Sequence, residues 1–315
     1  MSEGGQTGVL ILILATAVTA GTPILYAALG ELLAERSGVI NLGVEGMMLI
    51  GAVSGFVVAV QTANPWAGVA AAMLAGGMVA AIHAFLTITL RSNQVVSGLA
   101  LTIFGAGLSG YLGKGYIGVP VPAPFASKPL PVLGDIPVIG PIFFNHDPLV
   151  YITYLLVPVL WIYIYRTRTG LHMRAVGENP SAADSLGVNV FLTRYVHVIA
   201  GGMLAGLGGA YLSLVYAPSW LENMTAGRGW IAVALVIFAV WNPLRALVGS
   251  YIFGGIDAIG FRLQVLGVVA VPTLFLKMLP YIFTILVLII IIGRNKAART
   301  GQPKALGVPF DREER

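Results

Sequence analysis

Long apolar runs separated by short polar intervals dominate the chain. Most runs approach the roughly 20 residues that an α-helix needs to cross about 30 Å of hydrocarbon. The pattern predicts an all-α fold, a polytopic transmembrane helical bundle that forms a single domain over residues 1–315. The seventh run is short enough to be a half-helix. The nine expected spans are residues 8–29, 39–61, 66–90, 95–117, 149–165, 191–216, 229–241, 245–266 and 273–293.

The polar interval at residues 166–189 carries signals for the start and the end of a helix. Asn179 suits an N-cap, and Pro180 suits the first helical position, where its missing N–H costs nothing. Gly187 can adopt the left-handed conformation that ends a helix. The pattern predicts a short capped helix over residues 181–186, and an ordered loop fits it about equally well.

The other long interval, residues 119–148, contains seven prolines before Pro148 and is almost uncharged. Each proline removes a backbone donor and restricts the residue before it, so we expect an ordered loop without regular helix. A cap over helix ends is favoured over a contact site for an external partner.

A weak repeat relates the third span to the eighth. Asn64-Pro65 begins the third span, and Gly76-Gly77 follows. Asn242-Pro243 and Gly254-Gly255 recur in the eighth at the same offset of 178 residues. Because five spans separate the copies, the second would enter the membrane from the opposite side, as in the inverted repeats of transporters.

Composition agrees with a membrane protein. Hydrophobic residues make up 57% of the chain and charged residues only 10%, against about 25% in soluble proteins. Cysteine is absent and the four histidines lack metal-ligand spacing, so neither a metal nor another cofactor is expected. The first residues, MSEGGQTG, lack a positive n-region, so the first run is interpreted as a retained span.

Basic residues are distributed unevenly between the two sides of the predicted membrane. If the C-terminus is cytoplasmic, thirteen basic residues lie inside and five outside, which agrees with the positive-inside rule. This orientation places residues 166–189 and a basic tail, residues 294–315, in the cytoplasm, and the N-terminus and the loop 119–148 outside. The inside set is Arg36, Arg91, Arg166, Arg168, Arg174, Arg194, Arg245, Arg294, Lys296, Arg299, Lys304, Arg312 and Arg315, and the outside set is Lys114, Lys128, Arg228, Arg262 and Lys277.

Ionisable residues at membrane depth are candidates for function because burying them is costly. Asn41 and Glu45 are four residues apart, which places both on one face of a helix. Gly43 and Gly46 would let this span be broken. Asp257 lies past the middle of the eighth span. For both carboxylates, interior hydrogen bonding is slightly favoured over direct contact with a substrate.

Uncharged polar residues open the fourth span. Asn93, Gln94 and Ser97 offer amides and a hydroxyl, which suit a neutral, hydroxyl-rich or heterocyclic ligand. They fit a helix cap equally well.

Motifs of enzymes are missing from the sequence. Gly113-Lys114 lacks the upstream glycine of a phosphate-binding loop, and neither paired catalytic carboxylates nor a nucleophile elbow occurs. The chain is therefore expected not to be an enzyme, and ATP-driven transport would need another chain to bind ATP.

Four ordered stretches resemble the permease subunits of bacterial ABC importers of the branched-chain amino acid, ribose and simple-sugar type, and within them the nucleoside permeases. They are GELLAERSGVINLGVEGMM at 30–48, NQVVSGLAL at 93–101, RAVGENP at 174–180 and GRGWIA at 227–232. The resemblance covers nearly the whole chain. It is more specific for the family than for the substrate.

The resemblance implies a multi-pass permease subunit of the bacterial cytoplasmic (inner) membrane. It would pair with a second homologous permease subunit, as a homodimer or heterodimer, around a central pathway. Cytoplasmic ABC ATPases would drive transport and an extracytoplasmic binding protein would deliver the ligand, a nucleoside or simple sugar by analogy. No nucleic-acid partner is expected.

The resemblance also implies roles for particular residues. The segment from Arg174 to Gly187 matches the segment that docks into the ATPase, which makes the short helix a rigid lever with Arg174 and Glu178 as contacts. The expected coupling residues are Arg174, Gly177, Glu178, Asn179, Pro180, Ala182, Ala183, Leu186 and Gly187. The expected pathway residues are Asn41, Glu45, Asn93, Gln94, Ser97, Trp230 and Asp257.

Two alternatives remain open at this point. An ion-coupled secondary transporter would use Glu45 or Asp257 as its coupling carboxylate, but it would leave the capped helix without a purpose. A purely structural membrane scaffold ranks last, because buried polar residues are costly unless they are used or paired.

Overall fold

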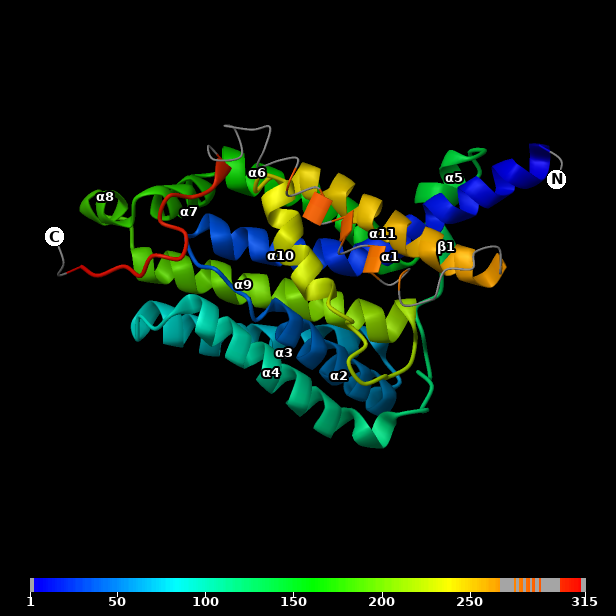
Figure 1. Cartoon of the computed structure of the whole chain (residues 1–315), viewed down its shortest axis with the longest axis horizontal. Coiled ribbons are helices and arrows are strands. Elements are labelled where there is room, and N and C mark those ends of the chain that lie inside the picture. Colours follow the sequence, from blue (N-terminus) through cyan, green and yellow to red (C-terminus); the bar gives the residue numbers. More distant parts are fainter. Residues whose placement is uncertain are drawn as a thin grey trace.

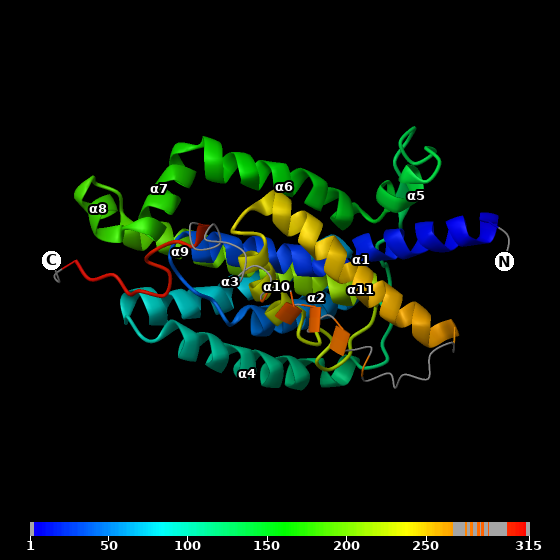
Figure 2. The same cartoon turned by 45° about the horizontal axis from the view of Figure 1, so that its top comes forward.

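The computed structural model describes residues 3–266, positions 275, 278–279, 282–283, 285–286 and 289, and residues 301–312. Long helices lie side by side in a bundle (Figures 1 and 2). The N-terminus and α5 (Ile139–Phe143) lie at one end, and α7 (Arg168–Glu178), α8 (Pro180–Ser185) and the C-terminal segment lie at the other.

Among the described residues, six helices are long and apolar enough to cross a membrane. They are α1 (Glu3–Arg36), α2 (Val44–Thr62), α3 (Pro65–Ala84), α4 (Gln94–Gly113), α6 (Pro148–Arg166) and α9 (Val190–Tyr211). Phe85–Thr89 continues α3 and Leu212–Tyr216 continues α9 as π-helical turns, and Lys114–Tyr116 continues α4 as a 3₁₀ turn. These helices correspond to the first six predicted spans.

The seventh and eighth predicted spans are helices in the structure, whereas the ninth lies mostly outside the described residues. The seventh is the short helix α10 (Arg228–Phe238), as expected for a half-helix, and the eighth is α11 (Pro243–Leu266). The ninth, residues 273–293, falls largely outside the described residues, although its eight described positions are helical. The second prediction began too early, since residues 39–43 are not helical, and the first ended too early, since α1 continues to Arg36.

Asparagine and aspartate side chains start the long helices after α2. Asn64 caps α3, Asn93 caps α4, Asp147 caps α6 and Asn189 caps α9, each accepting from backbone N–H groups of the first turn. Proline occupies the first helical position of α3, α6 and α11.

Glycines allow the central helices to touch through their backbones. A Cβ at Gly30 of α1 would clash with the carbonyl oxygen of Gly201 in α9, and one at Gly76 of α3 with that of Gly202. Gly254 of α11 packs in the same way on Ala17 of α1. Small residues at such crossings are typical of membrane bundles.

The helices that carry the predicted repeat run in opposite directions. The helix α3 starts at the end of the bundle that carries the N-terminus, whereas α11 runs toward that end (Figure 1). Gly76 and Gly254, at equivalent positions of the two copies, both make close backbone contacts. The geometry agrees with an inverted repeat.

Two predicted loops contain regular structure that the sequence did not indicate. Within residues 119–148, α5 and the pairing of β1 (Lys128–Pro129) with β2 (Asn145–His146) correct the expectation of a loop without helix. Isolated bridges join Ile117 to Trp220 and Pro120 to Ser219. Within residues 166–189, α7 precedes the predicted helix and was not expected.

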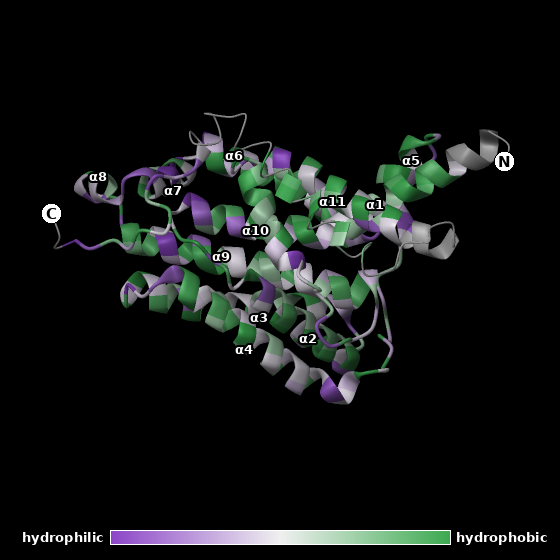
Figure 3. Ribbon diagram, in the orientation of Figure 1, coloured by the Kyte–Doolittle hydropathy of each residue, from purple (hydrophilic) through white to green (hydrophobic). Residues whose placement is uncertain are grey.

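Hydrophobic residues predominate along the long helices, and hydrophilic ones gather around α7, α8 and the C-terminal segment (Figure 3). We call this end, with Arg36, Arg91, residues 166–189 and residues 301–312, the basic face. The other end, with residues 117–147 and 217–226, is the opposite face.

Candidate functional site

A buried, non-helical segment at residues 37–43 joins α1 to α2. The backbone N–H of Asn41 donates to Glu31 Oε1 at 3.0 Å, and Asn41 Oδ1 accepts from Gly43 N at 3.0 Å. Because α2 begins only at Val44, the prediction that Asn41 and Glu45 share a helical face is wrong. The prediction that this span is broken agrees with the structure.

Side chains from α3 and α4 hold the same segment. Gln94 Oε1 accepts from Ile40 N at 2.7 Å, and His83 Nε2 lies 2.9 Å from Ile40 O. Ser97 Oγ lies 3.0 Å from His83 Nδ1, and Asn93 caps α4. Of these predicted pathway residues, Gln94 satisfies the irregular backbone at Ile40, Ser97 bonds to the side chain of His83, and the exposed Asn93 caps the first turn of α4.

Glu45 anchors the first turn of α10. Its Oε1 atom accepts from the Thr225 hydroxyl at 2.6 Å and from Gly227 N at 2.8 Å, and its Oε2 atom accepts from Gly229 N at 2.6 Å. The side chain is buried. A carboxylate at a helix N-terminus satisfies free N–H groups and interacts favourably with the helix dipole.

The first residue of α10, Arg228, forms an ion pair with Asp257 of α11. Arg228 Nη2 lies 3.0 Å from Asp257 Oδ2, and the two side chains are 12% and 25% exposed. The guanidinium carbon of Arg228 lies 5.4 Å from the ring centroid of Tyr216, a cation–π distance. Trp230 lies half-buried two residues further along α10. We call Glu45, Tyr216, Thr225, Arg228 and Asp257 the half-helix site.

The half-helix site lies at mid-depth in the bundle. Gly46, next to Glu45, packs on the backbone of Leu101 and Thr102 in the middle of α4, and Asp257 lies past the middle of α11. The predicted pathway residues therefore form two groups. Glu45, Trp230 and Asp257 lie at the start of α10, whereas Asn41 lies in the segment 37–43 and Asn93, Gln94 and Ser97 lie at the start of α4.

The end of α10 is anchored by residues that the sequence reasoning missed. The indole Nε1 of Trp241 donates to Glu35, and Trp241 O accepts from Arg36 Nε and Nη2 at 3.2 and 3.0 Å. Glu31 and Glu35, 1% and 3% exposed, stand one helical turn apart in α1. Their spacing could have identified them as costly buried acids, but the predicted span ended at residue 29.

The predicted coupling segment contains the expected short capped helix, α8. Asn179 Oδ1 accepts from Ala182 N at 3.0 Å, and Pro180 is the first helical residue. Gly187 has φ +83°, and the N–H groups of Val188 and Gly187 donate to Ala183 O and Asp184 O at 3.0 and 2.9 Å. These bonds form a Schellman motif, so both ends of the short helix are capped.

The residues predicted to contact the ATPase include both exposed and internal ones. Arg174 points inward, with its guanidinium carbon 5.5 Å from the ring centroid of Tyr165, and Gly177 and Ala183 are buried. Leu186, a large apolar residue, is 85% exposed. Pro180 is half-buried, and Glu178, Asn179, Ala182, Leu186 and Gly187 are exposed.

The C-terminal segment, residues 301–312, lies across the basic face. Ala305 N donates to Gly177 O at 2.9 Å, and Arg312 binds both carboxylate oxygens of Asp184 at 2.7 and 2.9 Å. Hydrogen bonding to Asp184 raises the pKa of the Arg312 guanidinium. Arg91 forms an ion pair with Asp311. The segment thus ties α7, α8 and the start of α4 together.

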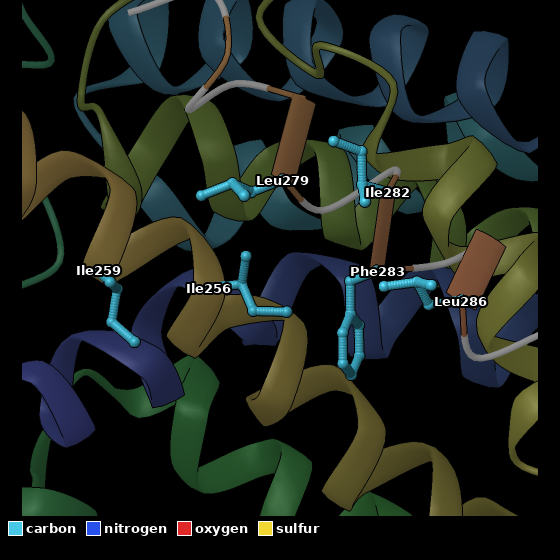
Figure 4. Close-up of a pocket in the computed structure, with 6 residues that line it drawn as sticks. All are labelled: Ile256, Ile259, Leu279, Ile282, Phe283 and Leu286. Carbon is cyan, nitrogen blue, oxygen red and sulfur yellow. The ribbon is translucent and has the colours of Figure 1, made fainter. Parts of the chain in front are cut away.

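A cavity of about 280 Å³ lies between α11 and described residues of the ninth predicted span (Figure 4). Only apolar side chains line it: Ile256, Ile259, Leu279, Ile282, Phe283 and Leu286. It offers no polar group to orient a hydrophilic ligand. Within the described part of the chain, no group of three or more His, Cys, Asp or Glu side chains is placed to hold a metal ion.

The family described as "Branched-chain amino acid transport system / permease component" matches residues 13–293. The "Putative glucose ABC transporter permease protein TsgC13" of Haloferax volcanii is 44% identical over 317 residues, covering 94% of this chain and 96% of its own. The guanosine ABC transporter permease protein NupQ of Bacillus subtilis is 37% identical over 317 residues. The nucleoside ABC transporter permease protein NupC of Lactococcus lactis subsp. cremoris is 36% identical over 316 residues. Each of the last two comparisons covers 96% of this chain and 97% of the relative.

The chain therefore belongs to the family of branched-chain amino acid transport system permease components. It is a multi-pass membrane protein and an ABC transporter permease subunit, a transport component without an ATPase site of its own. Membership implies ATPase and substrate-binding partners. This confirms the predicted class and decides against both the ion-coupled transporter and the scaffold.

Proposed function

We propose that this chain imports a neutral polar solute, a nucleoside or a simple sugar, across the bacterial cytoplasmic membrane. The substrate class rests on the relatives, whose names refer to glucose, guanosine and nucleosides. The chain pairs with a second homologous permease subunit, as a homodimer or heterodimer. The basic face is cytoplasmic, as the charge bias predicts.

The ATPase docks on α8. The observation that carries this assignment is the doubly capped helix at the basic face. Leu186, which follows the helix, is 85% exposed, and Arg312 binds Asp184 within the helix. A short, stiff element with an exposed apolar residue suits transmission of a rigid-body movement. Ala182 and Leu186 are the contacts, whereas Arg174 supports α7 from within.

Co-purification tests the docking. Leu186→Glu and Ala182→Glu are expected to reduce recovery of the cognate ATPase with the tagged chain, because each places a charge in an apolar contact. Val132→Glu is the matched control, since Val132 is 77% exposed on the opposite face. Equal ATPase recovery with all three variants would contradict docking on α8.

The substrate proposal is tested separately, with the complete transporter in proteoliposomes. Uptake of radiolabelled guanosine, adenosine, glucose and leucine is compared with the partner binding protein present. We expect uptake of a nucleoside or of glucose and not of leucine. ATP-dependent leucine uptake alone would contradict the substrate class while leaving the docking site intact.

A further inference from the structure

The guanidinium of Arg36, the last residue of α1, hydrogen-bonds to three other parts of the chain, and its Nη1 donates to the carbonyl oxygen of Gly301 in the C-terminal segment at 3.4 Å. Nε and Nη2 donate to the carbonyl oxygen of Trp241, which follows α10, at 3.2 and 3.0 Å. Nη2 also donates to the hydroxyl of Tyr165 in the last turn of α6, at 3.1 Å. The planar fork of arginine donors suits two acceptors held at fixed positions.

Tyr165 joins this arginine to the coupling segment. The guanidinium carbons of Arg174 in α7 and of Arg36 lie 5.5 and 5.9 Å from the centroid of the Tyr165 ring. The backbone is equally close, because a Cβ at Gly177 would clash with the carbonyl oxygen of Arg36. A shift of α7 must therefore displace Tyr165, the end of α1, or both.

Trp241 lies in a strained link between α10 and α11. Val240 and Trp241 have φ angles of +51° and +52°, in the left-handed region that non-glycine residues disfavour, β-branched ones above all. Trp241 is 3% exposed, and its indole nitrogen donates to Glu35. Such a conformation persists when surrounding contacts over-determine it, and Glu35 and Arg36 supply those contacts.

We propose that Arg36 is a positioning residue that transmits movement of α7 to α10. The inference rests on the proposed function, because the movement starts where the ATPase docks. The first turn of α10 is held by Glu45, so a displacement of Trp241 tilts α10 about the half-helix site. The transmission consists of packed and hydrogen-bonded side chains between rigid helices.

The test measures substrate molecules transported per ATP hydrolysed by the complete transporter in proteoliposomes. Tyr165→Phe removes one hydroxyl, and Arg36→Lys keeps the charge but removes the fork. Both are expected to retain the ATPase and basal hydrolysis and to lower the ratio about tenfold, within the range of allosteric coupling energies. Arg166→Lys is the control, because Arg166 stacks on Trp161 at 5.9 Å instead of Tyr165.

A double variant shows whether the two residues act together. If they form one junction, Arg36→Lys with Tyr165→Phe lowers the ratio no further than the stronger single change. An unchanged ratio in Tyr165→Phe, an equal fall in Arg166→Lys, or fully additive losses would overturn the proposal. If the Arg36→Lys variant does not assemble with the ATPase, the transport ratio of Tyr165→Phe alone tests the proposal. Failure of the wild-type chain to bind an ATPase would instead overturn the proposed function.

Discussion

The carboxylate of Glu45 accepts a hydrogen bond of 2.6 Å from the backbone N–H of Gly229, although 184 residues separate them in the chain. With Thr225 and Gly227 as further donors, three hydrogen bonds converge on one buried side chain. The start of the half-helix is therefore fixed to α2. Both oxygens of Glu45 are occupied, which agrees with an anchoring role rather than with reversible binding of a coupling ion.

Glu45→Ala is expected to destabilise the protein by about 3 kcal/mol, since it leaves buried donors without an acceptor. Glu45→Gln is expected to cost about 1 kcal/mol, because one amide oxygen remains as acceptor while the NH₂ group faces a donor. Thermal unfolding of the detergent-solubilised chain measures both. Glu222→Gln, at an exposed position of the preceding loop, is the control. Normal stability with lost uptake in Glu45→Gln would contradict the anchoring role of Glu45.

Asp257→Asn is expected to cost about 1–2 kcal/mol, below the value for a fully buried pair because both side chains retain some exposure. The substitution removes the carboxylate that pairs with Arg228 in the middle of the bundle. Exchange of the pair, Arg228→Asp with Asp257→Arg, is expected to restore part of the stability. If the pair lies beside the pathway, the KM for uptake changes in the exchanged variant while ATPase recovery stays normal. A wild-type KM would place the pair away from the substrate.

The bidentate contact between Arg312 and Asp184 is expected to keep α8 ordered. Arg312→Glu replaces the attraction with repulsion, so amide hydrogens of residues 183–186 are expected to exchange with deuterium faster. Asp184→Arg combined with Arg312→Glu reverses the pair and is expected to restore slow exchange. Exchange rates at α8 that do not respond to either variant would show that the C-terminal segment does not brace the helix.

Asp147 gives the protein a specific dependence on pH. Burial raises the pKa of this carboxyl, which outweighs the hydrogen bonds from Val150, Tyr211 and Leu149 that lower it. A raised folded-state pKa means that the folded state binds the proton more tightly than the unfolded chain, so stability is lost as pH rises through this range. Relative to Asp147→Asn, which keeps an N-cap acceptor, the wild type is expected to lose thermal stability from about pH 4 upward. A constant difference between pH 4 and pH 7 would contradict this.

Local signals in the sequence predict much of the fold. Asn64, Asn93 and Asn179 each precede a helix and cap it, and apolar length locates most spans. The ends of spans are less predictable when buried charges extend them, as Glu31, Glu35 and Arg36 extend α1.

The site depends on contacts that local pattern does not contain. Glu45 meets Thr225 and Asp257 meets Arg228 only after the bundle has formed, and the charge count placed Arg228 outside the membrane. Resemblance predicts the coupling role of Arg174 to Gly187 as one segment, but burial separates the residues of that segment into exposed and internal ones. Arg174 faces Tyr165, and only packing between α6 and α7 reveals this.

The most direct test of the account is a disulfide cross-link between α8 and the ATPase. The chain has no cysteine, so single cysteines can be introduced without background. Ala182→Cys is expected to cross-link to a cysteine in the ATPase groove under oxidation, with a yield that changes when nucleotide binds, and Val132→Cys is expected not to. Equal yields from the two positions, or a yield from Ala182→Cys that nucleotide leaves unchanged, would contradict docking on α8.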